Sequence, residues 1–370
     1  MLRSITLALT RTSASLLCLK LLEFTVNKGS EIADLKTTTH SILRRLRDTE
    51  LGLLLKALES RGGDVSSCVY FPYGEKVCKR VVHEPHVVLY RTFREPNVQS
   101  SNELKPLAIC SRRDSTGKRV CINPHHYSEI IQIQSPTPEL QQNLSPKPHT
   151  KQDESSGFGS NFTETQSTDC SSKKQPNLPL SISELFESTS EWPSAWCVVA
   201  YWELNECIGP FYHGHQDVIN IYETLPKPKG FCLAGLDRNQ NVSDGTKRAR
   251  NHVGFGLQLS REEDGIWIYN RSEYAVFANG TTFPYVTTTP SASQNITVTK
   301  VPPGFSLKIY DYNHSPATCR TFEGPQSWKV PESVRISFAK GWGNTSSASY
   351  RRPVVTSCPC WLEIHFTVSR

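Results

Sequence analysis

The chain has 370 residues, of which 37% are hydrophobic and 9% aromatic, and its net charge is +6. This length suits two folded domains with connecting sequence. The sequence has no run of 18 apolar residues, which excludes a multi-span membrane protein, and 12 cysteines are too few for a disulfide scaffold.

The positive charge is uneven along the chain. Residues 31–133 hold 16 basic and 12 acidic residues, a net charge of +4, whereas residues 181–370 balance at 17 and 17. Such an excess is typical of a domain that contacts nucleic acid or another acidic partner. A solvated basic face explains it equally well.

The first 24 residues carry Arg3, Arg11 and Lys20, with no acid before Glu23. This pattern resembles a mitochondrial transit peptide or a poor secretory signal. The alternative is an N-terminal extension without function over residues 1–30. A secretory signal would make N-x-S/T sequons available for glycans, among them those at Asn143, Asn161, Asn241, Asn270, Asn279, Asn295 and Asn344.

Leucine spacing predicts one helix over residues 34–59, ended by Gly62 and Gly63. Residues 68–133 are mixed, and VVLY (87–90) is predicted to be a strand. In residues 134–180, 30 of 47 are Ser, Thr, Pro, Gln, Asn or Gly. Such a segment cannot bury enough apolar area to offset its ordering entropy, so we expect a disordered linker.

From Trp196 onward, short segments rich in β-branched and aromatic residues alternate with turns. Regular turn signals over about 175 residues favour a β-sandwich. The predicted strands lie within 196–204, 218–225, 230–236, 265–270, 275–280, 295–301, 305–312, 333–342 and 360–366.

One group of residues has the composition of a structural zinc site. Three thiolates and one imidazole complete a tetrahedral zinc sphere with no position left for water, and Cys121 and His126 have the short spacing expected of ligands on one turn. Cys68 and Cys110 would complete the set. The competing ligands are Cys78, His83, His86 and His125. Buried cysteines beside surface histidines are the other interpretation.

Two basic segments are candidates for binding, with a solvated charged hairpin and a mobile surface loop as the alternative interpretations. A hairpin within residues 68–85 carries Lys76, Lys79 and Arg80, and a two-stranded ribbon fits the DNA major groove. The loop at 340–353 carries Lys340, Arg351 and Arg352, which suit an acidic or phosphorylated partner. A third cluster, at 247–250, has the composition of a solvated turn or import signal. No nucleophile elbow, Walker loop or zinc-protease motif indicates an enzyme.

Seven longer motifs follow one another along the chain. They are LKALESRGG (55–63), ELKPLAIC (103–110), CINPHHY (121–127), WCVVAYWEL (196–204), GIWIYNRSEYAVF (265–277), VPPGFSLKIYDY (301–312) and FAKGWG (338–343). In these motifs the chain resembles the Smad family of signal transducers over nearly all of residues 31–370.

The resemblance implies a multidomain α+β protein. It places a small zinc-stabilised α/β N-terminal Mad-homology domain at 31–133, a disordered linker at 134–190 and a C-terminal Mad-homology domain at 191–370. The second domain would be a β-sandwich of Smad/FHA-like type with flanking helices and loops. The family's zinc ligands fall on Cys68, Cys110, Cys121 and His126, which implies one structural Zn²⁺ per chain.

The subclass is indicated by three sequence features. After WLEIHF (361–366) no Ser-Ser-x-Ser tail follows for receptor phosphorylation, and SCPCWLE (357–363) and LESRGG (58–63) resemble the inhibitory class. The resemblance therefore implies a non-enzymatic inhibitor of transforming growth factor-β superfamily (BMP/activin) signalling in cytoplasm and nucleus. Its partners would be type I receptor serine/threonine kinases and other Smads.

The implied receptor contacts are Lys300, Lys308, Lys340, Arg351 and Arg352. Two departures from the family pattern stand out. The loop residues 344–349 are an insertion relative to the usual length, and Leu140 replaces the Tyr of a Pro-Pro-x-Tyr motif, so WW-domain ubiquitin ligases are not expected partners. The alternative function is a DNA-binding transcriptional cofactor of common-partner or divergent Smad type, with Lys76, Lys79 and Arg80 as candidate DNA contacts.

Overall fold

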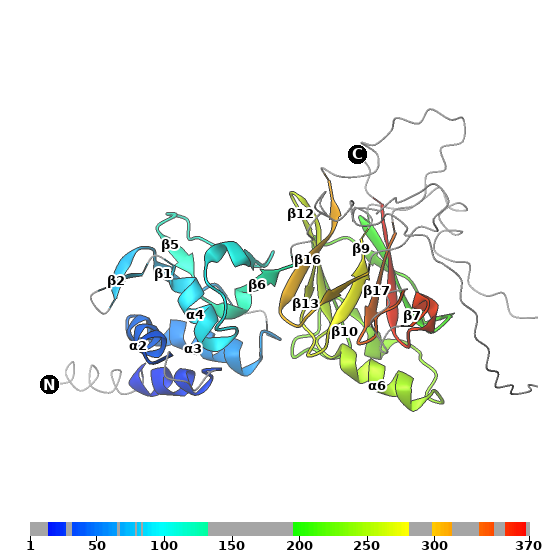
Figure 1. The fold of residues 1–370 in the computed structure, drawn as a ribbon, viewed down its shortest axis with the longest axis horizontal. Helices are drawn as coiled ribbons and strands as arrows, with labels where there is room; N and C mark the ends of the chain where they lie inside the picture. The colour runs from blue at the N-terminus through cyan, green and yellow to red at the C-terminus, as the bar shows by residue number, and fades with distance from the viewer. Residues whose placement is uncertain are drawn as a thin grey trace, which may run out of the picture.

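The computed structural model describes residues 14–26, 32–64, 67–77, 80–82, 84–131, 195–280, 298–312, 333–343 and 352–367 (Figure 1). The predicted disordered linker at 134–190 and the insertion at 344–349 lie outside these ranges. Among the described residues, no helix is both long enough and apolar enough to cross a bilayer.

The first helical region differs from the single predicted helix over 34–59. It consists of α2 (Ile32–Leu43) and α3 (Asp48–Glu59), which are separated by residues 44–47. The carboxylate of Glu50 accepts the backbone N–H of Arg47 at 3.0 Å, and this bond caps the start of a new helix. Leucines of both helices still enter one core. The leucine spacing therefore predicted the buried side correctly, but the prediction of a single continuous helix was wrong.

The predicted strand at 87–90 is wrong. These residues belong to α4 (Pro85–Phe93). Proline is preset for the first helical turn, and helical spacing places Leu89 and Phe93 in one core cluster and Val87 and Tyr90 in another. Burial on two faces explains the continuous apolar run, because period-2 and fully buried helical patterns cannot be told apart over four residues.

Short strands and turns complete the N-terminal domain. Strand β1 (Tyr70–Pro72) pairs with β5 (Arg119–Cys121), and β2 (Glu75–Val77) pairs with β3 (Arg80–Val82). Strand β4 (Leu104–Pro106) pairs with β6 (Tyr127–Ile130). The 3₁₀ turns η1 (Ser101–Glu103) and η2 (Pro124–His126) precede β4 and β6.

Residues 14–23 form a further helix that packs on this domain. Its Cys18 and Leu21 are buried in the same core as Leu43 and Leu51. This part of the N-terminal extension therefore contributes apolar area to the domain. The predicted targeting signal covers residues 1–24, and its first 13 residues lie outside the described ranges.

The C-terminal domain is the predicted β-sandwich, and its core lies between two sheets. One sheet has β11 (Phe231–Cys232), β10 (Val218–Tyr222), β12 (Leu257–Glu262), β13 (Gly265–Asn270) and β16 (Phe305–Asp311) in that order. The other has β15 (Val298–Val301), β14 (Val276–Asn279), β17 (Ser333–Phe338), β18 (Trp361–Phe366), β7 (Cys197–Glu203) and β8 (Glu206–Cys207), and β9 (Tyr212–Gly214) also pairs with β7. Two 3₁₀ turns, η4 (Leu233–Gly235) and η6 (Val355–Ser357), accompany them.

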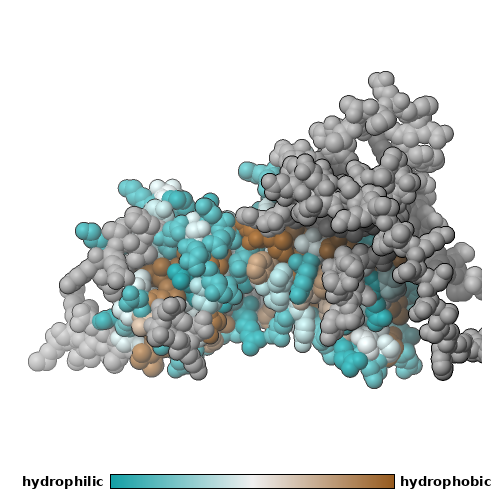
Figure 2. Space-filling model, in the orientation of Figure 1, coloured by the Kyte–Doolittle hydropathy of each residue, from teal (hydrophilic) through white to brown (hydrophobic). Residues whose placement is uncertain are grey.

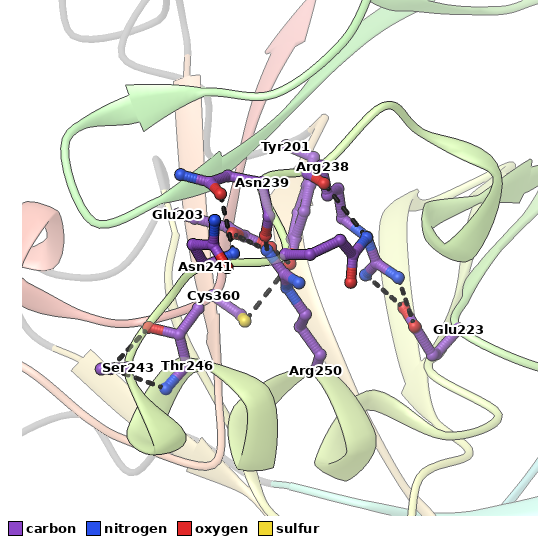
Figure 3. Close-up of polar contacts among 11 residues, drawn as sticks. Tyr201, Glu203, Glu223, Arg238, Asn239, Asn241, Ser243, Thr246, Arg250 and Cys360 are labelled. Atoms are coloured by element: carbon purple, nitrogen blue, oxygen red, sulfur yellow. Dashed lines mark hydrogen bonds and ion pairs between the residues drawn. The ribbon is translucent and has the colours of Figure 1, made fainter.

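Helix α6 (Asp244–Val253) closes one end of the sandwich. Its Arg250 forms a buried ion pair with Glu203 of β7, at 2.6 Å between Nη2 and Oε2 (Figure 3). Ser243 caps the helix by accepting the N–H of Thr246 at 3.2 Å. Arg250 is therefore a structural residue and not part of a solvated basic turn, unlike the exposed Lys247 and Arg248 beside it.

The two domains share a sheet. Strand β6 of the N-terminal domain adds in parallel to β16 of the sandwich, so that β6 and β4 extend the first sheet to seven strands. The N–H of Ile131 donates to the carbonyl of Ser306 at 3.0 Å, and the buried hydroxyls of Ser128 and Ser306 hydrogen-bond at 2.7 Å. In the space-filling view the two domains abut on this face (Figure 2).

Ion pairs reinforce this domain contact. Lys105 Nζ lies 2.6 Å from Glu262 Oε2, and both side chains are mostly buried. The same ammonium lies 4.7 Å from the ring centre of Trp267. Arg61 pairs with Glu273 at 2.6 Å in an exposed position, where such pairs contribute little.

Candidate metal centre and basic surfaces

Four predicted ligands come together in the N-terminal domain. Cys68 precedes β1, Cys110 ends a turn after Leu107, Cys121 ends β5 and His126 ends η2. Asn123 holds this last turn by accepting the N–H of His125 at 3.0 Å. All four ligand atoms lie within 4.8 Å of one another.

The spacing of these atoms fits a tetrahedral zinc ion. The sulfur atoms of Cys68 and Cys110 are 3.9 Å apart, and His126 Nδ1 lies 3.5 Å from the sulfurs of both Cys68 and Cys121. Zinc–sulfur and zinc–nitrogen bonds of ordinary length give sulfur–sulfur and sulfur–nitrogen separations of roughly 3.5–3.8 Å. The residues present therefore fit the metal.

The three thiols also show why a cation belongs among them. Contact with the Cys110 thiol lowers the pKa of Cys68, whereas contact with the same thiol raises the pKa of Cys121. One thiolate thus forms at the expense of its neighbours, because adjacent like charges repel. Three thiolates at this spacing require a cation, and a coordinated thiol is deprotonated.

The competing ligands occupy other positions. His86 is buried beside the ring of Tyr127, at 5.2 Å between ring centres, and His125 lines a cavity between the domains. Cys78 and His83 lie outside the described ranges. Among the described residues, the ligand cluster has only the four predicted members.

The predicted hairpin is the β2–β3 pair. Lys76 is exposed on β2, and Arg80 begins β3 opposite Val77, whereas Lys79 lies outside the described ranges. Arg45 of the loop after α2 supports the hairpin, because its guanidinium contacts the Glu75 carboxylate at 2.8 Å and donates to the Lys76 carbonyl at 3.2 Å. Figure 1 shows β2 at the end of the molecule away from the sandwich, so the docked domain leaves it uncovered.

Main-chain hydrogen bonds hold Arg352 beside the turn that contains Lys340. The N–H of Arg352 donates to the carbonyl of Gly341 at 2.8 Å, and the N–H of Gly343 donates to the carbonyl of Arg352 at 2.9 Å. The exposed Arg352 is thus fixed beside the turn that begins with Lys340. Arg351, its neighbour in the prediction, lies outside the described ranges.

An apolar cluster supports this turn from below. Trp342 packs with Val298, Val355, Cys358 and Trp361, and Phe277 and Trp202 lie against them. A Cβ on Gly341 would lie 2.8 Å from the Phe277 ring, so glycine allows the turn to sit directly on that ring. The 340–343 turn and Arg352 are therefore anchored to the sandwich.

The other two predicted receptor contacts lie apart from each other. Lys300 is exposed on the edge strand β15, in the same sheet as β17. Lys308 lies on β16 of the opposite sheet, where its ammonium pairs with Asp264 at 2.6 Å and Asp311 at 3.2 Å. The structure thus places Lys300 on the sheet that contains β17, Lys340 and Arg352 at the turn that follows β17, and Lys308 on the other sheet.

Comparison with known proteins identifies both halves of the chain. Residues 35–131 match the MH1 domain and residues 194–367 match the MH2 domain. The chain is 38% identical over 349 residues to Mothers against decapentaplegic homolog 6 of Gallus gallus, covering 91% of this chain and 76% of that protein. It is 35% identical over 359 residues to homolog 7 of Mus musculus, covering 91% and 79%.

The chain belongs to the Smad family. Smads are non-enzymatic proteins of transforming growth factor-β superfamily signalling, with receptors and other Smads as their general partners. The interferon regulatory factor 9 IAD domain also matches, at 10% identity and a TM-score of 0.32, covering 48% of this chain and 85% of that domain. This likeness is too weak to support an argument.

The family confirms the predicted fold class, an MH1 domain with a Cys/His cluster and an MH2 β-sandwich. The cluster at Cys68, Cys110, Cys121 and His126 is consistent with a structural zinc site of MH1. The predicted domain boundaries stay predictions, as do the receptor-binding and DNA-binding residues.

Sequence reasoning named the basic cluster at 247–250 but did not connect it with the 340–343 turn. Burial, followed by the charges of Arg248 and Lys340, lowers the pKa of His252, which places these two cations close to one ring. Helix α6 packs beside β17, and this packing brings Arg248 toward the 340–343 turn. No signal along the chain links positions about 90 residues apart, so only the fold reveals the pair.

Proposed function

We propose that this chain is an inhibitory Smad that acts in the cytoplasm and nucleus. Its MH2 domain would bind activated type I receptor serine/threonine kinases of the BMP or activin branch and exclude receptor-activated Smads. Two observations support this proposal. The sequences of residues 58–63 and 357–363 resemble the inhibitory class, and the chain is similar to homologs 6 and 7.

The observation that carries the proposal is the anchored basic turn. Lys340 and Arg352 lie on a fixed main-chain bridge above the aromatic cluster, so little conformational entropy is lost when they meet a partner. Arg248 adds charge beside them, and Lys300 and Arg351 extend the predicted contact set. A phosphorylated receptor segment offers the carboxylate and phosphate groups that such cations bind best. Lys308 would contribute only after leaving Asp264 and Asp311.

The test is binding of the full chain to phosphorylated type I receptor kinase domains from the BMP and activin branches. Lys340→Glu should weaken binding by at least about tenfold, since it reverses a charge at the contact. Lys118→Glu is the control, because it reverses the charge of an exposed lysine in MH1, away from the 340–343 turn.

Binding to neither receptor branch would contradict the proposal. Equal binding by Lys340→Glu and Lys118→Glu would also contradict it, because the contact would then lie elsewhere. A stronger interaction with one branch would identify the pathway that the protein restrains.

We also propose that the MH1 cluster holds one structural Zn²⁺ per chain. Zinc would join the ends of β1 and β5 to the η2 turn, and a closed tetrahedral set has no catalytic position. Metal analysis of the purified chain should give one zinc, and Cys121→Ser should remove it. A folded wild-type protein without zinc would overturn this assignment.

The hairpin supports a second function, DNA binding by MH1. Lys76 is exposed on a strand that the sandwich does not cover, and Lys79 and Arg80 continue the basic hairpin in sequence. Specific binding should fall steeply with salt as phosphate contacts release counterions. Affinity that is the same for a Smad-binding sequence and random DNA would remove this function.

A further inference from the structure

An open cavity of about 680 Å³ lies at the domain contact. Gly62 and Arg94 line it from MH1, and His252, Arg271 and Tyr274 line it from MH2. Binding sites for small molecules are commonly of this size and often lie between domains. The cavity therefore exists only where the two domains are docked.

Two guanidinium groups in the wall are held by neutral acceptors. Arg271 donates to the side-chain oxygen of Asn220 at 3.0 Å and to the carbonyl of Gly62 at 2.9 Å. Arg94 donates to the carbonyls of Tyr127 at 2.7 Å and Pro124 at 3.3 Å. These bonds fix both planar groups in orientation, and none of the acceptors is a carboxylate.

The acids near the cavity are engaged with other groups. Glu59 pairs with Lys20 at 2.8 Å and Glu273 pairs with Arg61 at 2.6 Å. Glu129, the acid with electrostatic influence on Arg94, accepts the hydroxyl of Tyr90 at 3.3 Å. Among the described residues, no ion pair joins a carboxylate to Arg94 or Arg271.

This arrangement leaves two partly buried guanidinium groups facing a cavity without an ion-paired carboxylate. Burial lowers the pKa of Arg271, because a desolvated cation without a counterion is unfavourable. Gly304 lets Arg94 reach across the domain boundary, since a Cβ at Gly304 would lie 2.6 Å from Nη2 of Arg94. An anion in the cavity would stabilise both guanidinium groups.

Ring systems supply the rest of the wall. His252 stacks on Tyr274 with 3.8 Å between ring centres, and Phe255 and Tyr269 also line the cavity. Guanidinium groups bind phosphate in bidentate geometry, and aromatic rings accommodate an apolar or aromatic group. We propose that this cavity binds a small organic phosphate, with Arg94 and Arg271 on the phosphate and the rings against its organic part.

The test is calorimetric titration of the full chain at constant ionic strength. The probes are inorganic phosphate, glycerol 3-phosphate, adenosine monophosphate and, as the uncharged control, adenosine. We expect the phosphates to bind and adenosine not to bind, with the monophosphate that carries a ring bound most tightly. Absence of phosphate binding at millimolar concentration, or equal binding of adenosine, would overturn the proposal.

Variants locate the site. Arg94→Gln and Arg271→Gln should each weaken phosphate binding by about 10- to 100-fold, the usual contribution of a charged hydrogen bond. Arg261→Gln is the matched control, because Arg261 lies on β12 and pairs with Asp217 at the surface. Circular dichroism checks folding, and Arg271→Lys, which keeps the charge without the planar fork, should bind with intermediate affinity. Unchanged binding in both glutamine variants would overturn the proposal.

A distant variant tests the dependence on docking. Lys105 does not line the cavity, but Lys105→Glu places two carboxylates together at the Glu262 contact. Because a ligand held by both domains is linked to their contact, this variant should also weaken phosphate binding. Full affinity in Lys105→Glu would contradict a site built from both domains. None of these measurements involves receptor binding, so failure of the phosphate-site proposal and failure of the proposed inhibitory function can be distinguished.

Discussion

His86 shows how the interior of MH1 limits its stability in acid. Its side chain is buried against Tyr127, and burial lowers its pKa from 6.5 to about 4. The folded state therefore binds fewer protons than the unfolded state between these values. The stability contributed is complete above the unfolded pKa of about 6.5 and is lost as the pH falls toward about 4.

From this shift we predict a loss of about 2 kcal/mol between pH 7 and pH 5. Urea unfolding of the full chain at both pH values measures it. The zinc ligands also take up protons in acid, so the comparison is with His86→Phe, which should lose less stability by about that amount. The same loss in wild type and variant would show that His86 stays charged when buried.

The ion pair of Glu203 and Arg250 provides a second prediction. Both side chains are nearly fully buried, and removing one partner of such a pair leaves an uncompensated charge. Glu203→Gln should therefore lower the free energy of unfolding by about 3–5 kcal/mol. Asp217→Asn, which breaks the exposed pair with Arg261, should cost less than about 1 kcal/mol. Urea unfolding of both variants measures the difference, and equal costs would mean that water reaches the Glu203 pair.

At the scale of elements, Ser243 fixes the beginning of α6. Its hydroxyl accepts the N–H of Thr246, so Ser243→Ala should destabilise the protein by about 1 kcal/mol. Ser243→Asp should retain most of that stability, since aspartate caps helices equally well. Thermal unfolding distinguishes the two variants. A loss in Ser243→Asp as large as in Ser243→Ala would assign the effect to packing instead of capping.

Strands were predictable from sequence where runs of β-branched and aromatic residues are bounded by clear turns. Strands such as β7, β13 and β18 combine β-branched and aromatic residues with clear turns, and the predicted segments contain them. Strand β12 was missed although Gln258 and Ser260 alternate with its leucines as in a half-buried strand; in the structure both polar residues are buried as well. Helix α4 was taken for a strand because it buries two faces. In α4, contacts with distant parts of the chain override the local pattern.

The metal centre was predictable to a different degree. The spacing of Cys121 and His126 predicted two ligands on one turn, but Cys68 and Cys110 had rivals in Cys78 and three histidines. Only the fold decides among the described rivals, because it buries His86 in the core and directs His125 toward the cavity. Spacing fixes local pairs of ligands, whereas ligands from separate elements depend on tertiary packing.

At the scale of the whole molecule, the domain contact had no signature in the sequence. Lys105 and Glu262 are 157 residues apart, and the sequence around each of them predicts only an ordinary surface charge. Strand β6 leaves its edge open within MH1, and β16 leaves its edge open within the sandwich. Unpaired strand edges favour pairing with another edge, and here each domain covers the edge of the other.

A designed cross-link tests this arrangement. The hydroxyl oxygens of Ser128 and Ser306 are 2.7 Å apart, so cysteines at both positions lie within the range that a disulfide spans. Ser128→Cys with Ser306→Cys should form an intramolecular disulfide under mild oxidation, detected as a linked peptide by mass spectrometry. Adding Lys105→Glu should lower the yield by repulsion at Glu262, whereas Lys118→Glu, remote from the contact, should leave it unchanged. If the double-cysteine protein stays reduced, β6 and β16 are not paired in solution. The same conclusion follows if Lys105→Glu leaves the yield of the disulfide unchanged.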